Sequence, residues 1–245
     1  TPRPPAWRAG GAPPAAPSMA PAVLRLAVFD FDKTLSAAHV YYALAGGAGG
    51  LPVPPPYAVS ERGQLARIAE LDVLPEFAAS GGFAVAAFGG HERVLKLQAT
   101  FDELRGAGVE CFVCSRGLVG PIRKCLDQVG LLGVFSQVFA NVGPTGDCTD
   151  YDARLPQGYP GAQDALYLGS AANAGWGSKG RLVGRLMRER GLTFEEAVFV
   201  DDTASEVEEV QGICRTIFVE RGEGMGPREC SMLRQMLRAG AEGAP

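Results

Sequence analysis

Five apolar runs separated by helical patterns are the feature that most constrains the fold of this chain of 245 residues. The first, second and fourth runs lack alternating polar residues, which is typical of strands covered on both faces. Strands that alternate with helices pair in parallel through right-handed crossovers. The pattern therefore predicts an α/β fold built on a doubly wound, mainly parallel sheet. The predicted strands are Leu24–Phe29, Val109–Cys114, Val134–Ala140, Ala197–Val200 and Thr216–Val219.

Apolar residues at helical spacing predict the helices that connect these strands. Ile122 and Leu126 belong to such a pattern between the second and third strands. Between the third and fourth strands, a helix containing Leu182 and Leu186 is predicted to stop at Gly191. The other predicted core helices end near Gly106 and cover Pro227–Arg238.

The connection between the first two strands is far longer than a simple crossover needs, which indicates an insertion. We place this insertion at about residues 36–90. It contains a stretch rich in glycine and proline, 45–57, that we expect to be flexible. It also contains one predicted amphipathic helix around 61–70. The apolar side of that helix would carry Leu65, Ile68 and Ala69.

Composition indicates the domain organisation and excludes two classes of partner. Residues 23–245 are predicted to form one domain that includes the insertion, and residues 1–22, rich in proline and alanine, a disordered tail. The net charge of −4 gives no positive field for nucleic acid. No apolar run approaches the roughly 20 residues of a membrane span.

We expect a cytoplasmic protein. The alternative is an organelle-targeting remnant in the tail, which contains arginine and no acidic residue.

Six cysteines are spread along the chain, which favours reduced thiols that pack in the core. Cys111 and Cys114 have the spacing of a redox pair or half a zinc site, but they lie inside a predicted strand. Side chains three positions apart on a strand point to opposite faces. We therefore expect the two sulfurs to diverge and to serve packing.

Polar side chains gather where the predicted strands end. In open α/β sheets, ligands bind outside the carboxyl ends of the strands. Strand ends and helix starts lie at the same edge of such a sheet, so these side chains can meet at one site. They are Asp30, Asp32, Ser115, Asp201 and Asp202, together with Lys179 at the start of the helix before the fourth strand.

These groups together suit phosphoryl transfer. Four carboxylates close together need a cation, and hard oxygen ligands favour Mg²⁺. A serine hydroxyl and a lysine ammonium can hold phosphoryl oxygens, because such transfer depends on positioning and charge neutralisation. One carboxylate can act as a nucleophile and form an aspartyl phosphate, while a second protonates the leaving oxygen and then activates water.

The same residues carry a resemblance to a known family. "DFDKT" at Asp30–Thr34, then Ser115, Lys179 and "VFVDD" at 198–202 resemble the motifs of phosphatases and phosphotransferases of the haloacid dehalogenase (HAD) superfamily. The match covers the core and leaves out the tail and most of the insertion. The resemblance implies a Rossmann-like sheet, and a Mg²⁺-dependent phosphomonoester hydrolase that forms a phospho-aspartate at Asp30. The insertion would then be a small cap.

The resemblance also implies roles for the residues of the reacting centre. Asp30 would be the nucleophile and a metal ligand. Asp32 would be the acid/base and would bind the metal through its backbone carbonyl. Ser115 and Lys179 would bind the phosphoryl group, with Lys179 also restraining Asp30.

The remaining motif residues are assigned to metal and substrate. Asp201 and Asp202 would complete the metal site, with Asp202 the more secure direct ligand. Thr34 and Arg116 are candidates for substrate binding, and a local cap or ion pair is the alternative for Arg116.

Two departures from the common family pattern stand out. Lys33 replaces a frequent glycine after the second aspartate, and Glu206 stands where many relatives carry another acidic residue. Neither change removes an essential group. Aspartate at both Asp30 and Asp32 favours phosphate chemistry, because dehalogenase relatives lack the second carboxylate.

Three further places could contribute to a pocket. His39 follows the first motif closely and could reach the cleft, and Trp176 and Thr149–Asp152 could border the substrate. A purely structural role is the alternative for each.

The identity of the substrate stays open at this point. A short cap rich in proline and glycine leaves an open site, which suits a phosphoprotein as well as a small phosphorylated metabolite. Two alternatives to phosphomonoester hydrolysis remain open. One is a non-catalytic protein of the same fold that binds a phosphorylated ligand or partner, and the other is a phosphomutase or phosphotransferase.

Overall fold

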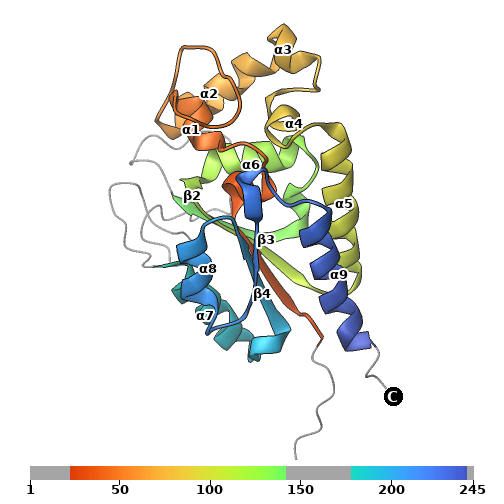
Figure 1. The fold of residues 1–245 in the computed structure, drawn as a ribbon. Coiled ribbons are helices and arrows are strands. Elements are labelled where there is room, and N and C mark those ends of the chain that lie inside the picture. The colour runs from red at the N-terminus through yellow and green to blue at the C-terminus, as the bar shows by residue number, and fades with distance from the viewer. Residues whose placement is uncertain (1–22, 142–177, 242–245) are drawn as a thin grey trace, which may run out of the picture.

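The computed structural model describes residues 23–141 and 178–241. Within these ranges, five strands form one sheet in the order β3-β2-β1-β4-β5, and all four neighbouring pairs are parallel (Figure 1). The doubly wound α/β fold predicted from the sequence is confirmed. The strands are β1 Leu26–Phe29, β2 Glu110–Leu118, β3 Phe135–Asn141, β4 Ala197–Asp201 and β5 Arg215–Phe218.

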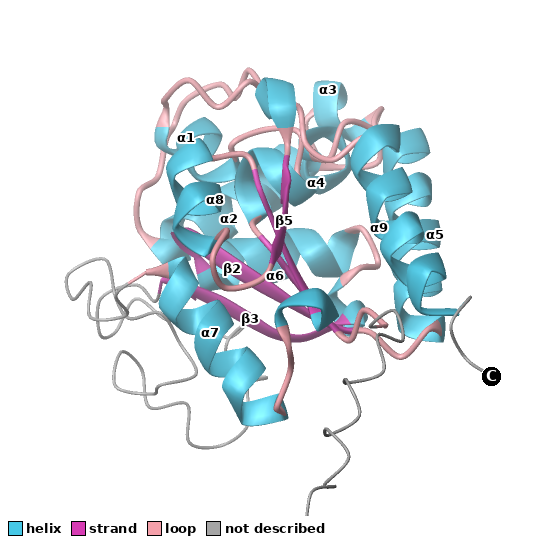
Figure 2. Cartoon of the chain, turned by 60° about the horizontal axis from the view of Figure 1, so that its bottom comes forward, coloured by secondary structure: helices cyan, strands magenta, loops and turns pink. Residues whose placement is uncertain are grey.

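Helices cover both faces of the sheet (Figure 2). Residues of three core helices and of the insertion that follows β1 join the apolar cluster on one face, and residues of two other helices join the cluster on the opposite face. Each cluster removes a continuous apolar surface from water, which stabilises the two-sided arrangement. On the first face lie α5 His91–Gly106, α6 Val119–Gln128 and α9 Pro227–Ala241, and on the second α7 Lys179–Arg190 and α8 Ala204–Val210.

The strands alternate between these two clusters. In β2, Cys111 packs in the first cluster and Cys114 in the second, so the sulfurs diverge as predicted. Both thiols are free and buried. Burial raises the pKa of Cys111 to about 12, which keeps its thiol protonated. The interpretation of this pair as packing residues is confirmed.

The insertion between β1 and β2 is more helical than the sequence predicted. Only the helix around 61–70 was expected; the other segments are too short to show a helical period. The insertion lies beyond the carboxyl ends of the strands, at the top of Figure 1. Its helices are α1 Val40–Ala45, α2 Glu61–Asp72, α3 Pro75–Ala78 and α4 Phe83–Ala87.

Helix α2 buries a partly different face from the predicted one. Leu65 and Ile68 are buried as expected, whereas Ala69 is exposed. Polar residues of α2 are buried instead of Ala69, and they donate hydrogen bonds to carbonyl groups of the preceding loop. Arg67 donates to Pro54 O at 2.6 Å, and Gln64 donates through Nε2 to a second loop carbonyl. These bonds hold the stretch of glycine and proline that the sequence led us to expect as flexible.

Arg93 of α5 joins the insertion to the core. Its partly buried guanidinium donates to the carbonyl oxygens of Leu35 and Phe88 at 2.8 Å and of Met225 at 3.2 Å. Burial lowers the pKa of Arg93 to about 10, so it remains cationic at neutral pH. One side chain thereby ties the turn after β1, the end of the insertion and the loop before α9.

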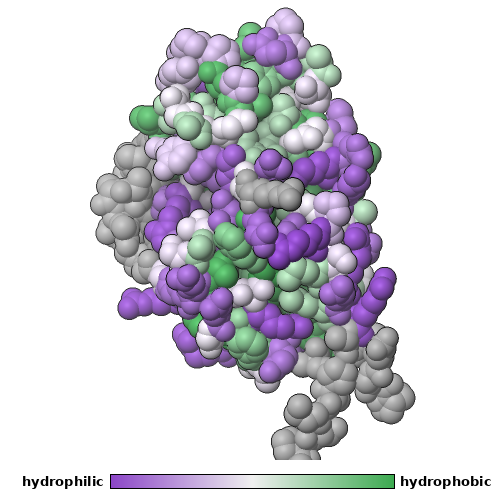
Figure 3. All heavy atoms as spheres, in the orientation of Figure 1, coloured by the Kyte–Doolittle hydropathy of each residue, from purple (hydrophilic) through white to green (hydrophobic). Residues whose placement is uncertain are grey.

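The surface of the insertion mixes polar and apolar side chains (Figure 3). Tyr42, Tyr57, Val59 and Val73 are exposed there. None of the helices in the described ranges has the length and apolar character needed to cross a membrane.

Candidate active site

The turn that follows β1 sets the first motif in place. Phe31–Leu35 form one irregular helical turn in which Lys33 has φ 60° and ψ 5°. This left-handed conformation favours glycine, which explains the frequent glycine at this position in the family that the sequence resembles. The turn is anchored by Met225 N, which donates to Thr34 O at 2.7 Å. Thr34 is fully buried, and its hydroxyl lies 3.4 Å from Asp202 Oδ1.

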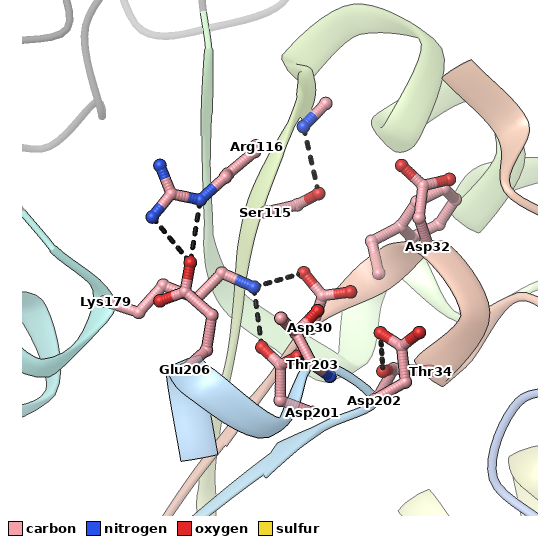
Figure 4. A network of polar contacts seen from close by, with 12 residues as sticks. Asp30, Asp32, Thr34, Ser115, Arg116, Lys179, Asp201, Asp202, Thr203 and Glu206 are labelled. Atoms are coloured by element: carbon pink, nitrogen blue, oxygen red, sulfur yellow. Dashed lines mark hydrogen bonds and ion pairs between the residues drawn. The ribbon is translucent and has the colours of Figure 1, made fainter. Parts of the chain in front are cut away.

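Lys179 links the ends of two neighbouring strands (Figure 4). It is the first residue of α7, and its Nζ donates to Asp30 Oδ1 and to Asp201 Oδ2 at 2.6 Å each. Burial alone would lower the pKa of Lys179, but Asp30 and Asp201 raise it well above its usual value. Burial raises the pKa of Asp30, and Lys179 opposes that shift. The ammonium ion therefore compensates two carboxylates in a buried setting.

Three carboxylates at this edge are close enough to share a cation. Ligand oxygens of Asp30, Asp201 and Asp202 all lie within 4.8 Å of one another. Asp201 is already engaged, because its Oδ2 accepts from Lys179 and its Oδ1 accepts from Thr203 N at 2.7 Å. Burial raises the pKa of Asp202. This donor set of hard oxygens fits a divalent cation such as Mg²⁺.

Asp32 faces a different part of the site. Its Oδ1 accepts from Val40 N at 2.6 Å, and its Oδ2 lies 3.4 Å from His39 Nδ1. Burial raises the pKa of Asp32 to about 7, although hydrogen bonds from the backbone of Val40 and Tyr41 lower it. Burial and Lys33 lower the pKa of His39 to about 4. Near pH 6, Asp32 is therefore largely protonated beside a neutral imidazole.

Ser115 and Arg116 lie on β2, which continues past the predicted end of the strand. Ser115 is buried, and its hydroxyl accepts from Gly117 N at 3.1 Å. The guanidinium of Arg116 binds Glu206 Oε1 through Nε at 2.8 Å. Figure 4 shows Arg116 turned toward Glu206, while Asp30 lies on the other side of Lys179. Arg116 is thus placed in an ion pair, the alternative that its position in the sequence left open.

A pocket of about 660 Å³ opens above these groups. Asp30, Asp32, Ser115, Lys179 and Asp202 line its inner part. Of the outer wall, the sequence pointed only to His39, because the pattern of the insertion otherwise shows only which residues are apolar. The wall includes His39, Tyr41, Tyr42, Val59, Glu61, Leu118 and Asn141.

The structure brings most of the predicted residues together at one edge of the sheet, whereas Thr34 is fully buried and is not among the residues that line the pocket. The register explains this, because β1 pairs with β2 on one side and with β4 on the other. Asp30, Ser115 and Asp201 therefore lie at adjacent strand ends. Trp176 and Thr149–Asp152 lie outside the described residues.

Comparison with known proteins places the chain beside phosphatases of known structure. No family model and no curated protein matches the sequence. Phosphoserine phosphatase with bound substrate matches at 18% identity and a TM-score of 0.41, over 80% of this chain and 85% of that one. A HAD-like hydrolase from Streptococcus pneumoniae matches at 12% identity and 0.40, over 86% and 91%. A protein described as a predicted phosphatase from Clostridium acetobutylicum matches at 14% and 0.43, over 89% and 100%. By their descriptions, these solved structures are a HAD-like hydrolase, a phosphoserine phosphatase and a predicted phosphatase.

Proposed function

We propose that this protein is a Mg²⁺-dependent phosphomonoester hydrolase that acts through a phospho-aspartate at Asp30. The observation that carries the proposal is the contact of Lys179 with Asp30 and Asp201, 2.6 Å each, next to Asp202 at the same edge of the sheet. A lysine ammonium among strand-end carboxylates suits the binding of a phosphoryl group and a divalent cation.

The first chemical step is a displacement at phosphorus. A carboxylate oxygen of Asp30 attacks, the bond from phosphorus to the leaving oxygen breaks, and Asp32 gives its proton to that oxygen. The raised pKa of Asp32, about 7, suits a proton donor near neutral pH. Lys179 neutralises charge on the phosphoryl oxygens, and Ser115 can donate its hydroxyl proton to one of them.

Hydrolysis of the intermediate completes the cycle. Asp32, now ionised, takes a proton from water, whose oxygen attacks phosphorus and releases the Asp30 carboxylate. Asp30, Asp201 and Asp202 would hold Mg²⁺ with the Asp32 backbone carbonyl, and Asp201 also orients Lys179. When bound, Mg²⁺ supplies neutralisation of the negative charge that builds on the phosphoryl oxygens.

The proposal includes a domain assignment. Residues 23–245 would be the catalytic domain, with residues 36–90 as a small cap that borders the pocket. The substrate would be a phosphorylated metabolite or phosphoprotein.

The test is a hydrolysis screen with added Mg²⁺. Purified protein should release phosphate from p-nitrophenyl phosphate, and Asp30→Asn should lower the rate by at least about 10³-fold. Asp127→Asn is the matched control, because Asp127 is exposed on α6. Full activity in Asp30→Asn would remove Asp30 as the nucleophile.

The screen also separates the alternatives. A panel of sugar phosphates, nucleotides, phospholipid headgroups and phosphopeptides that bind without turnover would favour a non-catalytic protein. Formation of an isomerised sugar phosphate in place of free phosphate would favour a mutase.

A further inference from the structure

The pocket has two ends of different chemistry. The inner end carries Asp30, Ser115 and Lys179, which suit a phosphoryl group. The outer end is built by the insertion, whose helix α1 and the loop before α2 contribute Tyr42 and Val59. A phosphate ester held at the inner end would therefore direct its leaving group toward this outer wall.

The outer wall contains a preformed aromatic pair. The rings of His39 and Tyr42 stack with centroids 3.9 Å apart and planes at 30°. Tyr41 meets the ring of Tyr42 edge-on, with centroids 5.8 Å apart. Tyr42 is 49% exposed and Val59 is 67% exposed. A ring that covers this surface would gain from apolar burial and from aromatic contact.

Two polar side chains of the outer wall, Glu61 and Ser60, are already engaged with the protein. Glu61 Oε1 accepts from Gly120 N at 2.6 Å, and the hydroxyl of Ser60 accepts from Gly63 N at 3.1 Å. These bonds cap α6 and α2, so a ligand would have to displace them in order to use either side chain.

The charges of the pocket disfavour a second anionic group. The cationic residues of its described lining are Lys179, paired with Asp30 and Asp201, and Arg116, paired with Glu206. The remaining ionisable carboxyl groups of that lining belong to Asp32, Asp202 and Glu61, which offer no positive charge. A leaving group with its own carboxylate or phosphate would therefore find no uncommitted counter-charge in the described lining.

We propose that the substrate is a phosphate monoester whose leaving group carries an uncharged aromatic ring, and that Tyr42 selects this ring. The inference rests on the proposed function for the orientation of the ester. It adds the class of leaving group, which neither the motifs nor the strand-end residues specify.

Binding of non-hydrolysable phosphonates tests the selection separately from turnover. Benzylphosphonate and cyclohexylmethylphosphonate differ in the aromaticity of the ring and share the acidic head. Calorimetry with Mg²⁺ should show benzylphosphonate binding about 2- to 10-fold more tightly, the factor expected for an aromatic contact beyond area burial. Benzylphosphonate with a carboxylate at the para position should bind less tightly than the parent.

Matched variants assign the preference to one ring. Tyr42→Ala should abolish the difference between the two phosphonates, and Tyr42→Phe should keep it. Tyr57→Ala is the control, because Tyr57 is 50% exposed on the same insertion and is not among the residues that line the pocket. A melting curve for each variant checks that the insertion remains folded.

The outcomes separate this inference from the proposed function. Equal binding of the two phosphonates, binding of neither, or a preference that survives Tyr42→Ala would overturn the selection by Tyr42. Tighter binding of the carboxylated compound would contradict the uncharged leaving group. Hydrolysis of benzyl phosphate is measured in parallel. Ring preference without hydrolysis would refute the proposed activity alone, and hydrolysis without ring preference would refute the inference alone.

Discussion

The sheet and the insertion build the same pocket by different means. At the sheet edge, Asp30 and Asp201 lie at the ends of central strands and are buried around Lys179. In the insertion, short helices are joined by loops that depend on bonds from side chains such as Arg67 to backbone carbonyls. The comparison indicates that Asp30, Lys179 and Asp201 are fixed by the regular core, so the wall that would meet the proposed leaving group can vary without disturbing them. Asp32 is the exception, because its carboxylate accepts from Val40 N of the insertion.

The largest effect should come from removing the buried ammonium ion. Lys179→Ala leaves the carboxylates of Asp30 and Asp201 buried without their counter-charge, which should cost about 3 kcal/mol of stability and at least about 10³-fold in activity. Chemical denaturation and phosphate release measure the two effects. Lys96→Ala is the control, because Lys96 pairs with Glu92 on the exposed face of α5 and should cost less than about 1 kcal/mol. A mild effect of Lys179→Ala would show that the sheet edge is less rigid than its burial indicates.

The next effect is a pH-dependent stabilisation by Mg²⁺. Burial raises the pKa of Asp30, Asp32 and Asp202 above their ordinary value of 3.8. These three groups therefore bind more protons in the metal-free folded state than in the unfolded state, and their contribution to stability falls as the pH rises from about 4 to about 8. Mg²⁺ competes with these protons, so it should raise the melting temperature by several degrees more at about pH 8 than at about pH 5.5.

The control for this linkage is Asp202→Asn, which removes a proposed ligand. Its melting temperature should respond much less to Mg²⁺ at either pH. A Mg²⁺ shift that is independent of pH, or that persists in this variant, would place the cation elsewhere.

A smaller effect tests how firmly the insertion is attached. Glu61 of α2 accepts from Gly120 N at the start of α6 and so joins the insertion to the core. Glu61→Ala should cost about 1–2 kcal/mol and should raise hydrogen exchange in α2 and at the start of α6, while β1 stays protected. Glu76→Ala on the exposed side of α3 should have little effect. Equal destabilisation by both variants would remove this bond as the attachment.

The two regions also differ in how far the sequence predicted them. The five strands and the gathering of Asp30, Ser115, Lys179 and Asp202 at one edge followed from apolar runs and from the geometry of parallel sheets. That geometry is nearly independent of side-chain detail. The carboxyl ends of neighbouring parallel strands lie at the same edge of such a sheet.

The insertion was predicted less well for a physical reason. Ala69 was expected on the buried face of α2, but the buried positions include Arg67, whose guanidinium finds the carbonyl of Pro54 only after the loop has folded back. The same limit applies to Arg116 and Glu206, which lie 90 positions apart in the sequence and form an ion pair in the lining of the pocket. Hydrophobic periodicity predicts which apolar side chains are buried. It does not predict which polar side chains become partners in the folded protein.

The smallest expected effect concerns Lys33, where the two regions meet. Its left-handed backbone costs about 1–2 kcal/mol for a residue with a side chain, whereas glycine loses about 0.5–1 kcal/mol more chain entropy on folding. The two terms favour glycine by about 0–1.5 kcal/mol, so Lys33→Gly should raise the melting temperature by about 0–6 °C. Lys33→Val should lower it, because a branched side chain resists this conformation.

Lys33→Gly also tests whether the insertion is independent of the sheet edge, because it removes a side chain that reaches toward the insertion. Its Nζ lies so close to Gly50 that a β-carbon built there would be 2.8 Å away, so Lys33 reaches from the turn after β1 to the insertion. If Lys33→Gly lowers stability by more than about 0.5 kcal/mol, the backbone terms cannot account for the loss, because together they favour glycine or cancel. The side chain would then hold the insertion to the core, and the wall of the pocket would be less independent of the sheet edge than the rest of the structure indicates.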